Sequence, residues 1–270
     1  MRLGIGSYAM AWSIGVPGHA PPRPMTAFDL LEAADELGAG VVQICDNLPL
    51  DRLSDEELDR LARQATERGI QIEVGTRGIR PEHLRRYLKL AVRLQSPILR
   101  VVVDTTDHHP SPDEIVATVD PMLHEFSDAG VCLAIENHDR FRARQFVEIL
   151  QRLASPAAGI CLDTVNSFGA LEGPEVVVAA LIPWAVNLHL KDFCIRRVDH
   201  QMGFLVEGRP AGQGQLNVPW LLEQLRAAGR DLNAILEQWP LPQATIEETI
   251  AKEKAWARQS INYLRTLIAD

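Results

Sequence analysis

The sequence has few cysteines, few aromatic residues and no excess of positive charge. Its 270 residues include four cysteines, and 6% are aromatic. The cysteines are scattered, without the paired spacing of a zinc site, so we expect reduced and mostly buried thiols in a cytoplasmic protein. Acidic residues number 36 against 27 Lys and Arg, a net charge of −9. Because phosphate contacts need a concentrated basic face, this balance argues against nucleic acid as a partner.

Long apolar runs are also missing. No apolar stretch reaches the about 20 residues that span a bilayer, so no membrane partner is expected. Residues 1–6 enter a predicted strand without the apolar core of a signal peptide. The sequence contains no Gly-rich phosphate loop followed by Lys, and no linker or low-complexity segment. We therefore expect one domain over residues 1–270, with a small molecule as its partner.

Short apolar runs alternate with helical patterns along the whole chain. Strands are predicted at 3–8, 40–45, 70–75, 98–104, 131–136, 159–163, 186–190 and 233–238. Helices are predicted at 26–37, 54–68, 81–94, 111–129, 144–153, 172–181, 218–228 and 245–268. Ser54 and Glu57 have the spacing of a capping box, and Gly38, Gly69 and Gly130 stand where helices should end. The continuous apolar strands are typical of a parallel sheet that is covered on both sides.

Eight strands alternating with eight helices predict an α/β fold, a single (β/α)8 TIM barrel. An open, doubly wound sheet would also explain the alternation. It would not bring the ends of the last four strands to one point, however, so the closed barrel is favoured.

Each of the last four predicted strands has, at its carboxyl end or one residue before it, a side chain that can bind a hard cation. They are Glu136, Asp163, His189 and Glu237. The carboxyl ends of barrel strands converge, so the four side chains can meet. Three carboxylates and one imidazole suit an octahedral ion better than a structural zinc. We predict one divalent metal ion, with Mn²⁺ first and Mg²⁺, Co²⁺ or Zn²⁺ as alternatives.

Each of these residues also has a structural explanation when it is taken alone. A glutamate at a strand end can be a surface charge or the N-cap of the next helix. Asp163 and Thr164 can begin an Asx-type turn, and His189 can be a hydrogen-bonded core residue. The coincidence of all four at the same strand end favours the metal site.

The segments around these positions resemble the xylose isomerase-like barrel family. That family includes sugar phosphate isomerases and epimerases, ketose 3-epimerases, inosose dehydratases and relatives of endonuclease IV. The matching pieces are Glu136-Asn137-His138, Asp163-Thr164-Val165-Asn166, His189-Leu190-Lys191-Asp192 and Glu237. The resemblance implies that Glu136, Asp163, His189 and Glu237 are the metal ligands. It also implies that Glu136 and Glu237 act as the acid/base pair.

Two positions depart from the ketose 3-epimerases. Asn166 stands where those enzymes have a histidine, and Ile195 stands where they have an arginine, with Arg196 and Arg197 following it. Both positions hold substrate hydroxyls in those enzymes, so a ketohexose 3-epimerase is disfavoured. The few histidines at strand ends and the acidic charge disfavour DNA repair.

Further polar residues near the strand ends are candidates for binding the substrate. They are Arg77, His138, Asn166, Lys191, Arg196, Arg197 and Gln213. Several cations beside a metal favour a substrate with a carboxylate or phosphate, and the missing phosphate loop favours a sugar acid. Arg77 could instead pair with Asp46 or Asp104. Arg100 is expected in a salt bridge at the opposite end of its strand.

The primary hypothesis is a divalent-metal-dependent isomerase or epimerase. It would act on a small keto-sugar or sugar-acid derivative through a metal-stabilised enediolate. The alternative is a lyase that uses the same metal site to decarboxylate a 3-oxo sugar acid. A dehydratase of the inosose type and a sugar-binding barrel without turnover are less favoured. Size and family lead us to expect a homodimer.

Overall fold

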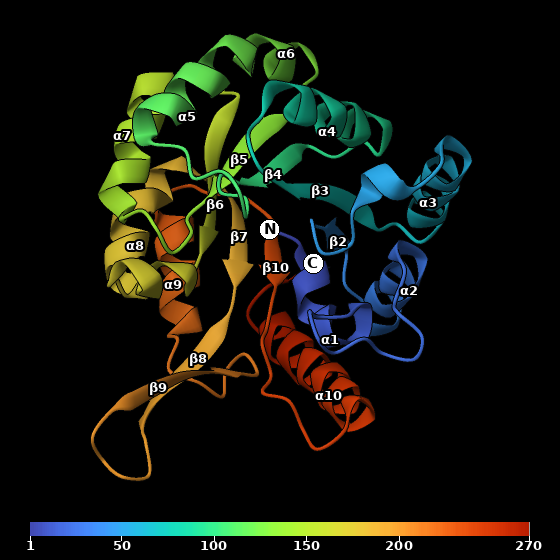
Figure 1. Ribbon diagram of the computed structural model, residues 1–270, viewed down its shortest axis with the longest axis vertical. Helices are drawn as coiled ribbons and strands as arrows, with labels where there is room; N and C mark the ends of the chain where they lie inside the picture. Colours follow the sequence, from blue (N-terminus) through green and yellow to red (C-terminus); the bar gives the residue numbers. More distant parts are fainter. Residues whose placement is uncertain (270) are drawn as a thin grey trace.

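The computed structural model describes residues 1–269, and its centre is a closed barrel of parallel strands (Figure 1). The barrel strands are β1 (Leu3–Gly6), β2 (Val41–Ile44), β3 (Gln71–Arg77), β4 (Ile98–Val102), β5 (Cys132–Glu136), β6 (Ala158–Asp163), β7 (Ala185–Leu190) and β10 (Ala234–Leu236). Neighbours in the barrel follow chain order, and β10 closes the ring by pairing with β1, Leu3 opposite Ala234. The predicted (β/α)8 TIM barrel is confirmed.

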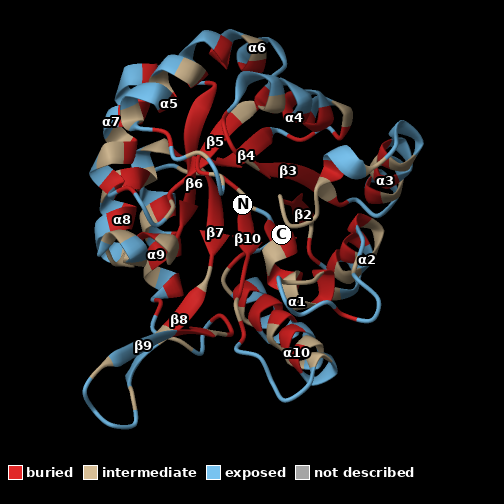
Figure 2. Ribbon diagram, in the orientation of Figure 1, coloured by how far each residue is buried: buried red, intermediate tan, exposed pale blue. Residues whose placement is uncertain are grey.

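Helices surround the barrel, and each buries the face that it turns toward the strands (Figure 2). They are α2 (Ala27–Leu37), α3 (Asp55–Glu67), α4 (Pro81–Arg93), α5 (Pro112–Val119), α6 (Leu123–Asp128), α7 (Ala143–Leu153), α8 (Pro174–Leu181), α9 (Val218–Ala227) and α10 (Ile246–Arg265). The predicted capping box is present, because Ser54 accepts from the Glu57 N–H and Glu57 from the Ser54 N–H. Gly38 ends α2 with a φ of 68°, which glycine adopts without steric cost.

Two segments differ from the prediction. The helix expected over 111–129 is divided into α5 and α6 by a short turn, Asp120–Met122. Pro121 causes the break, because it lacks the N–H that would continue the helix. The long connection after β7 contains an unexpected antiparallel hairpin of β8 (Asp192–Arg197) and β9 (Phe204–Arg209). This hairpin projects from the barrel at the lower left of Figure 1.

The connection after β1 is also partly ordered into helix. It contains a 3-10 turn, Ser7–Met10, and the short helix α1 (Ala11–Ile14). α1 packs against α10, which places the first connection close to the last helix.

Buried polar side chains interrupt several of the apolar barrel strands. They are Gln43 on β2, Glu73 on β3, Arg100 on β4 and Asn187 on β7, and each is at most 2% exposed. Hydrogen bonds among Gln43, Glu73 and Asn187 connect three strands, so these side chains form a polar layer inside the barrel. Within residues 1–269, no helix combines the length and apolar composition that crossing a bilayer requires.

Candidate metal and substrate site

Four side chains meet at the carboxyl ends of β5, β6, β7 and β10. Glu136 and Asp163 are the last residues of their strands, His189 lies opposite Asp163 on β7, and Glu237 follows β10. All four are at most 1% exposed. His189 Nδ1 lies 3.2 Å from Glu136 Oε2, 3.7 Å from Asp163 Oδ2 and 3.4 Å from Glu237 Oε1. Residues that the chain separates by up to a hundred positions therefore surround one imidazole nitrogen.

The atoms at the centre of this cluster lack ordinary partners. His189 Nδ1 and Glu237 Oε1 are buried and have no hydrogen bond within residues 1–269. A buried polar atom without a partner is costly. Several carboxylate oxygens around one imidazole nitrogen are a donor set that suits a divalent cation. The residues present thus fit one such ion.

Asp163 uses its two carboxylate oxygens for different purposes. Oδ1 accepts hydrogen bonds from the main-chain N–H groups of Val165 and Asn166, each at 2.8 Å. The Asx-type turn considered from the sequence is therefore present. It occupies only Oδ1, and Oδ2 faces His189, so the turn orients the carboxylate toward the cluster.

Lys191 lies at the mouth of the cluster, between two of its carboxylates. Its Nζ is 2.7 Å from Asp163 Oδ2 and 2.9 Å from Glu237 Oε2, and its side chain is 14% exposed. Burial disfavours the charged ammonium, but the carboxylates outweigh burial and raise the pKa of Lys191 above its usual value. Asn166 joins the same group, accepting from Lys191 Nζ and donating to Glu136 Oε1. The structure brings both predicted residues to the cluster.

Arg100 also belongs to this cluster, so the expectation of a salt bridge at the other end of its strand is wrong. Its side chain points into the barrel and is long enough to reach the carboxyl ends of the strands. Nε donates to Glu136 Oε2, and Nη1 donates to Asp46 Oδ1 at 3.0 Å. Burial raises the pKa of Glu136, yet the charge of Arg100 outweighs it and, with Lys191, holds that pKa well below its usual range. Glu136 is therefore a weak base.

Arg77 and His138 lie around the rim and are only partly buried. Arg77 Nε is 3.3 Å from Asp46 Oδ2, and its Nη1 donates to the main-chain oxygen of Asp104. Arg77 therefore pairs with Asp46, as the sequence allowed, and its side chain is still 33% exposed. His138 Nδ1 lies 2.6 Å from Asp139 Oδ1, with 27% exposure. Both side chains remain accessible to a ligand at the mouth.

Arg196 and Arg197 lie on the projecting hairpin, not at the cluster. Arg196 pairs with Glu207 on the neighbouring strand at 2.7 Å. Arg197 extends over the ring of Phe204, 4.7 Å from its centroid. Their role in binding substrate stays a prediction that this geometry does not favour.

Gln213 lies in a loop that Asp192 organises. Asp192 Oδ2 accepts from the N–H groups of Gly212 and Gly214, each at 2.9 Å, and Oδ1 accepts two further main-chain N–H groups. A Cβ on Gly214 would lie 2.1 Å from Asp192, so this close approach requires glycine. Gln213 is exposed and donates to Gln259 on α10. Its predicted contact with substrate also stays a prediction.

Sequence reasoning missed the polar layer beneath the cluster. His189 Nε2 lies 2.6 Å from Gln43 Oε1, and Gln43 Nε2 donates to Glu73 Oε2 at 3.0 Å. A signal was present for Gln43, which is the one polar residue of its apolar strand. In a parallel strand buried on both faces, such a residue has to point into the barrel and find a partner there.

Cys161 is a further polar neighbour of Glu136 and His189. Its Sγ donates to Asn187 Oδ1 at 3.4 Å. Burial, reinforced by the charge of Glu136, raises the pKa of Cys161 well above its usual value. The thiol therefore stays protonated, and the oxygen and imidazole donors remain the better set for a hard cation.

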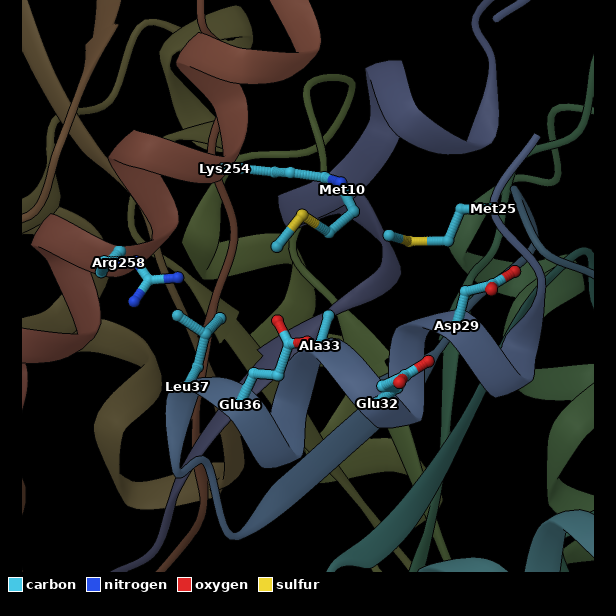
Figure 3. A pocket seen from close by; sticks show the side chains of 9 residues that line it. All are labelled: Met10, Met25, Asp29, Glu32, Ala33, Glu36, Leu37, Lys254 and Arg258. Carbon is cyan, nitrogen blue, oxygen red and sulfur yellow. The ribbon is translucent and has the colours of Figure 1, made fainter. Parts of the chain in front are cut away.

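A separate cavity of about 190 Å³ lies between α2 and α10 (Figure 3). Asp29, Glu32 and Glu36 of α2 line one side of it, and Lys254 and Arg258 of α10 line another. The cluster described above comes from barrel strands instead, so the cavity and the cluster are separate places.

The fold and the cluster define a TIM barrel with a candidate cation site at the carboxyl end of its strands. Residues 31–267 match the xylose isomerase-like TIM barrel family, and the chain belongs to that family. The resemblance seen in the sequence is thereby confirmed. Across 266 residues the chain is 38% identical to 3-oxo-isoapionate decarboxylase of Pectobacterium atrosepticum, covering 98% of this chain and 96% of that protein.

Solved structures agree on the fold. D-psicose 3-epimerase with D-tagatose from Clostridium cellulolyticum H10 superposes with a TM-score of 0.74 at 15% identity, over 98% of this chain and 99% of the other. A xylose isomerase-like TIM barrel protein from Mycobacterium smegmatis in complex with magnesium gives 0.67 at 14% identity, over 97% of each chain. At these identities the likeness concerns the fold alone.

Proposed function

We propose that this protein is a divalent-metal-dependent lyase that decarboxylates a 3-oxo sugar acid. The observation that carries the proposal is the buried contact of Arg100 with Glu136. The 38% identity to a named decarboxylase over nearly the whole chain supports it. The isomerase or epimerase hypothesis becomes the second candidate, supported by the second carboxylate of the predicted acid/base pair.

The cation would be held by Glu136, Asp163, His189 and Glu237, with Mn²⁺ as the proposed ion. His189 Nδ1 and Glu237 Oε1 support this assignment, because neither has a hydrogen bond within residues 1–269. When bound, the ion would supply positive charge that stabilises negative charge developing on a substrate oxygen.

The basicity of Glu136 separates the two reactions. Epimerisation removes a proton from one face of a carbon and returns one to the other, which requires two competent acid/base groups. Glu136 accepts from Arg100 and from Asn166, and its pKa is lowered well below the usual value. Decarboxylation needs no base, because the departing CO₂ leaves its bonding electron pair behind. A site with one weakened carboxylate therefore suits decarboxylation better.

The proposed reaction needs one proton. The bond between the carboxylate carbon and its neighbour breaks, CO₂ departs, and the electron pair moves onto the ketone oxygen. Restoring the ketone requires one proton at the carbon that lost CO₂. We assign its delivery from water to Glu237, whose Oε1 would hold the cation and whose Oε2 lies 2.9 Å from the Lys191 ammonium.

The charges of the site favour an anionic substrate. Glu136, Asp163, Glu237 and Asp46 are offset by Lys191, Arg100 and Arg77, which leaves one negative charge when His189 is neutral. A divalent cation turns this into one positive charge. Lys191 and Arg77 are partly exposed cations near the mouth, and they can pair with a substrate carboxylate.

The reaction is tested by incubating manganese-loaded protein with 3-oxo sugar acids in D₂O. We expect release of CO₂ and one deuterium in the product at the carbon that carried the carboxylate. Glu237→Gln should lose turnover. Deuterium uptake into keto-sugars without any CO₂ would reject the lyase and support the isomerase.

The cation site is tested by metal content. His189→Ala and Asp163→Asn should lose bound Mn²⁺ in elemental analysis after equilibration and desalting, because each removes a ligand. His108→Ala is the matched control, since His108 lies on the loop after β4 and pairs with Glu114. Stoichiometric manganese in His189→Ala would contradict the assignment.

We further propose a cytoplasmic homodimer whose contact includes the β8–β9 hairpin. All four cysteines are free thiols, as a reducing compartment favours. Five of the nine large apolar side chains exposed in residues 1–269 lie between 195 and 206. Ile195 pairs with Val206 and Arg197 with Phe204, so these side chains share one face of the hairpin. A twofold dimer would cover the same face on both copies.

A further inference from the structure

We infer that Glu73 and Gln43 set the tautomer of His189, so that Nδ1 offers its lone pair to the cation. The inference rests on the proposed metal site, and it assigns a positioning role to residues below that site. Glu73 and Gln43 lie on β3 and β2, and they are 1% and 0% exposed.

Glu73 is surrounded by amide donors. Its Oε1 accepts from Asn233 Nδ2 at 2.7 Å. Its Oε2 accepts from Gln43 Nε2 at 3.0 Å and from Asn187 Nδ2 at 2.9 Å. All three partners are N–H groups, so the Glu73 carboxyl serves here as an acceptor only.

This arrangement fixes the orientation of the Gln43 amide. Its Nε2 faces two oxygens, Glu73 Oε2 and Asn187 Oδ1, each at 3.0 Å. Rotating the amide by half a turn would place its oxygen against both of them, which is repulsive. Gln43 Oε1 must therefore point the other way, toward His189.

The orientation of Gln43 in turn decides which nitrogen of His189 carries hydrogen. Gln43 Oε1 lies 2.6 Å from His189 Nε2, and an amide oxygen can only accept. Nε2 therefore carries the hydrogen, and the lone pair of the neutral ring is on Nδ1, the nitrogen that faces the three carboxylates. Partners of this kind orient metal-binding histidines and strengthen them as ligands.

Loss of the Nε2 hydrogen would break the bond to Gln43, so Nδ1 is the nitrogen that can bind a cation. Glu73 and Gln43 thus leave Nδ1 of His189 available to the metal and keep Nε2 bound to Gln43.

Glu73→Gln tests the inference, since it replaces one acceptor oxygen by a donor amide. Gln43 is then free to rotate and present Nε2 to His189, which would move the ring hydrogen to Nδ1. We expect Mn²⁺ to bind about 10- to 100-fold more weakly, the usual loss for such partners. Titration followed by electron paramagnetic resonance measures the affinity. Nitrogen-15 NMR of His189 in the magnesium-loaded protein reports the tautomer.

Glu253→Gln is the matched control. Glu253 is also a fully buried glutamate, but it lies on α10 and binds Ser13 and the main chain of Trp12. Its substitution should leave both the affinity and the His189 tautomer unchanged. If Glu73→Gln does not fold, Gln43→Met removes the acceptor of His189 directly and should give the same two changes.

The outcomes separate this inference from the proposed function. Unchanged affinity and an unchanged tautomer in Glu73→Gln would overturn the inference while the metal site stands. A wild-type protein that binds neither Mn²⁺ nor Mg²⁺ would overturn the metal site. In that case the His189 tautomer can still be compared between the wild type and Glu73→Gln. A difference would show that Glu73 and Gln43 set the tautomer.

Discussion

At the scale of single residues, Arg100 has the largest influence on the proposed chemistry. It is a fully buried cation whose partners are Glu136 and Asp46. Glu136 keeps its negative charge because this guanidinium is beside it, and the same contact weakens Glu136 as a base. Arg100 thus stabilises the negatively charged side chains that would hold the cation. It also disfavours a mechanism that requires two basic groups.

Replacing Arg100 by Met tests the stabilising role. The Glu136 charge would be left buried without its guanidinium partner, and loss of one partner from a buried pair costs about 3–5 kcal/mol. Urea unfolding in the presence of EDTA should show this loss, and Mn²⁺ should restore part of it. Arg77→Met is the control, because the partly exposed Arg77 pair should contribute less than about 1 kcal/mol. Equal stability of Arg100→Met and wild type would contradict the account.

At the scale of secondary-structure elements, Asp192 connects β7, the hairpin and the loop before α9. One carboxylate accepts four main-chain N–H groups across residues 193–216. The loop therefore depends on a single side chain located three residues after His189.

Asp192→Ala should loosen this loop. One hydrogen bond to a charged group contributes about 1.5–3 kcal/mol, so losing the four that share this carboxylate should cost at least that much stability. Hydrogen–deuterium exchange should rise over residues 210–216 before the barrel strands exchange. Asp199→Ala is the control, because Asp199 at the hairpin tip is fully exposed. Unchanged exchange in Asp192→Ala would reject the role of this carboxylate.

A second element-scale contact joins α10 to the connection after β1. Glu253 of α10 accepts from the N–H groups of Trp12 and Ser13 and from the Ser13 hydroxyl, at 2.7–2.9 Å. Burial raises the pKa of Glu253 to about 7, although these donors oppose the shift. The folded protein therefore holds a proton here that the unfolded chain releases near pH 4.5.

The raised pKa makes stability depend on pH in a defined direction. The proton on Glu253 contributes most to the free energy of unfolding below about pH 4.5. This contribution is lost as the pH rises through about 7, by about 3 kcal/mol in total. Glu253→Gln cannot release a proton, so its free energy of unfolding should not show this decline. Urea unfolding of both proteins at pH 5 and pH 8 measures the difference. Parallel changes in the two proteins would show that Glu253 does not titrate as described.

At the scale of the whole molecule, the hairpin is the exposed apolar feature that a second copy would cover. Replacing both Phe204 and Val206 by Asp places two charges on that face. Sedimentation velocity should then show monomers at concentrations where the wild type is dimeric. Val92→Asp, at an exposed position on α4, should leave the dimer intact. A dimeric double variant would move the contact to another surface.

The barrel itself was readable from the sequence. The eight strands agree with prediction to within a few residues at each end, because a strand buried on both faces is a continuous apolar run. The hairpin was missed because residues 198–203 lack a short turn motif that marks a hairpin, and β8 and β9 do not alternate apolar and polar residues.

The sequence by itself determined the barrel and the four polar residues at the ends of the last strands, since both depend on patterns that are local in the chain. Only the tertiary structure decided what those four residues contact. Gln43 and Asn187 are 144 positions apart, and Arg100 reaches Glu136 on the neighbouring strand. The first contact exists because closure of the barrel brings strands face to face across its axis, and the second because both side chains point into the barrel. No local pattern encodes which side chains then meet.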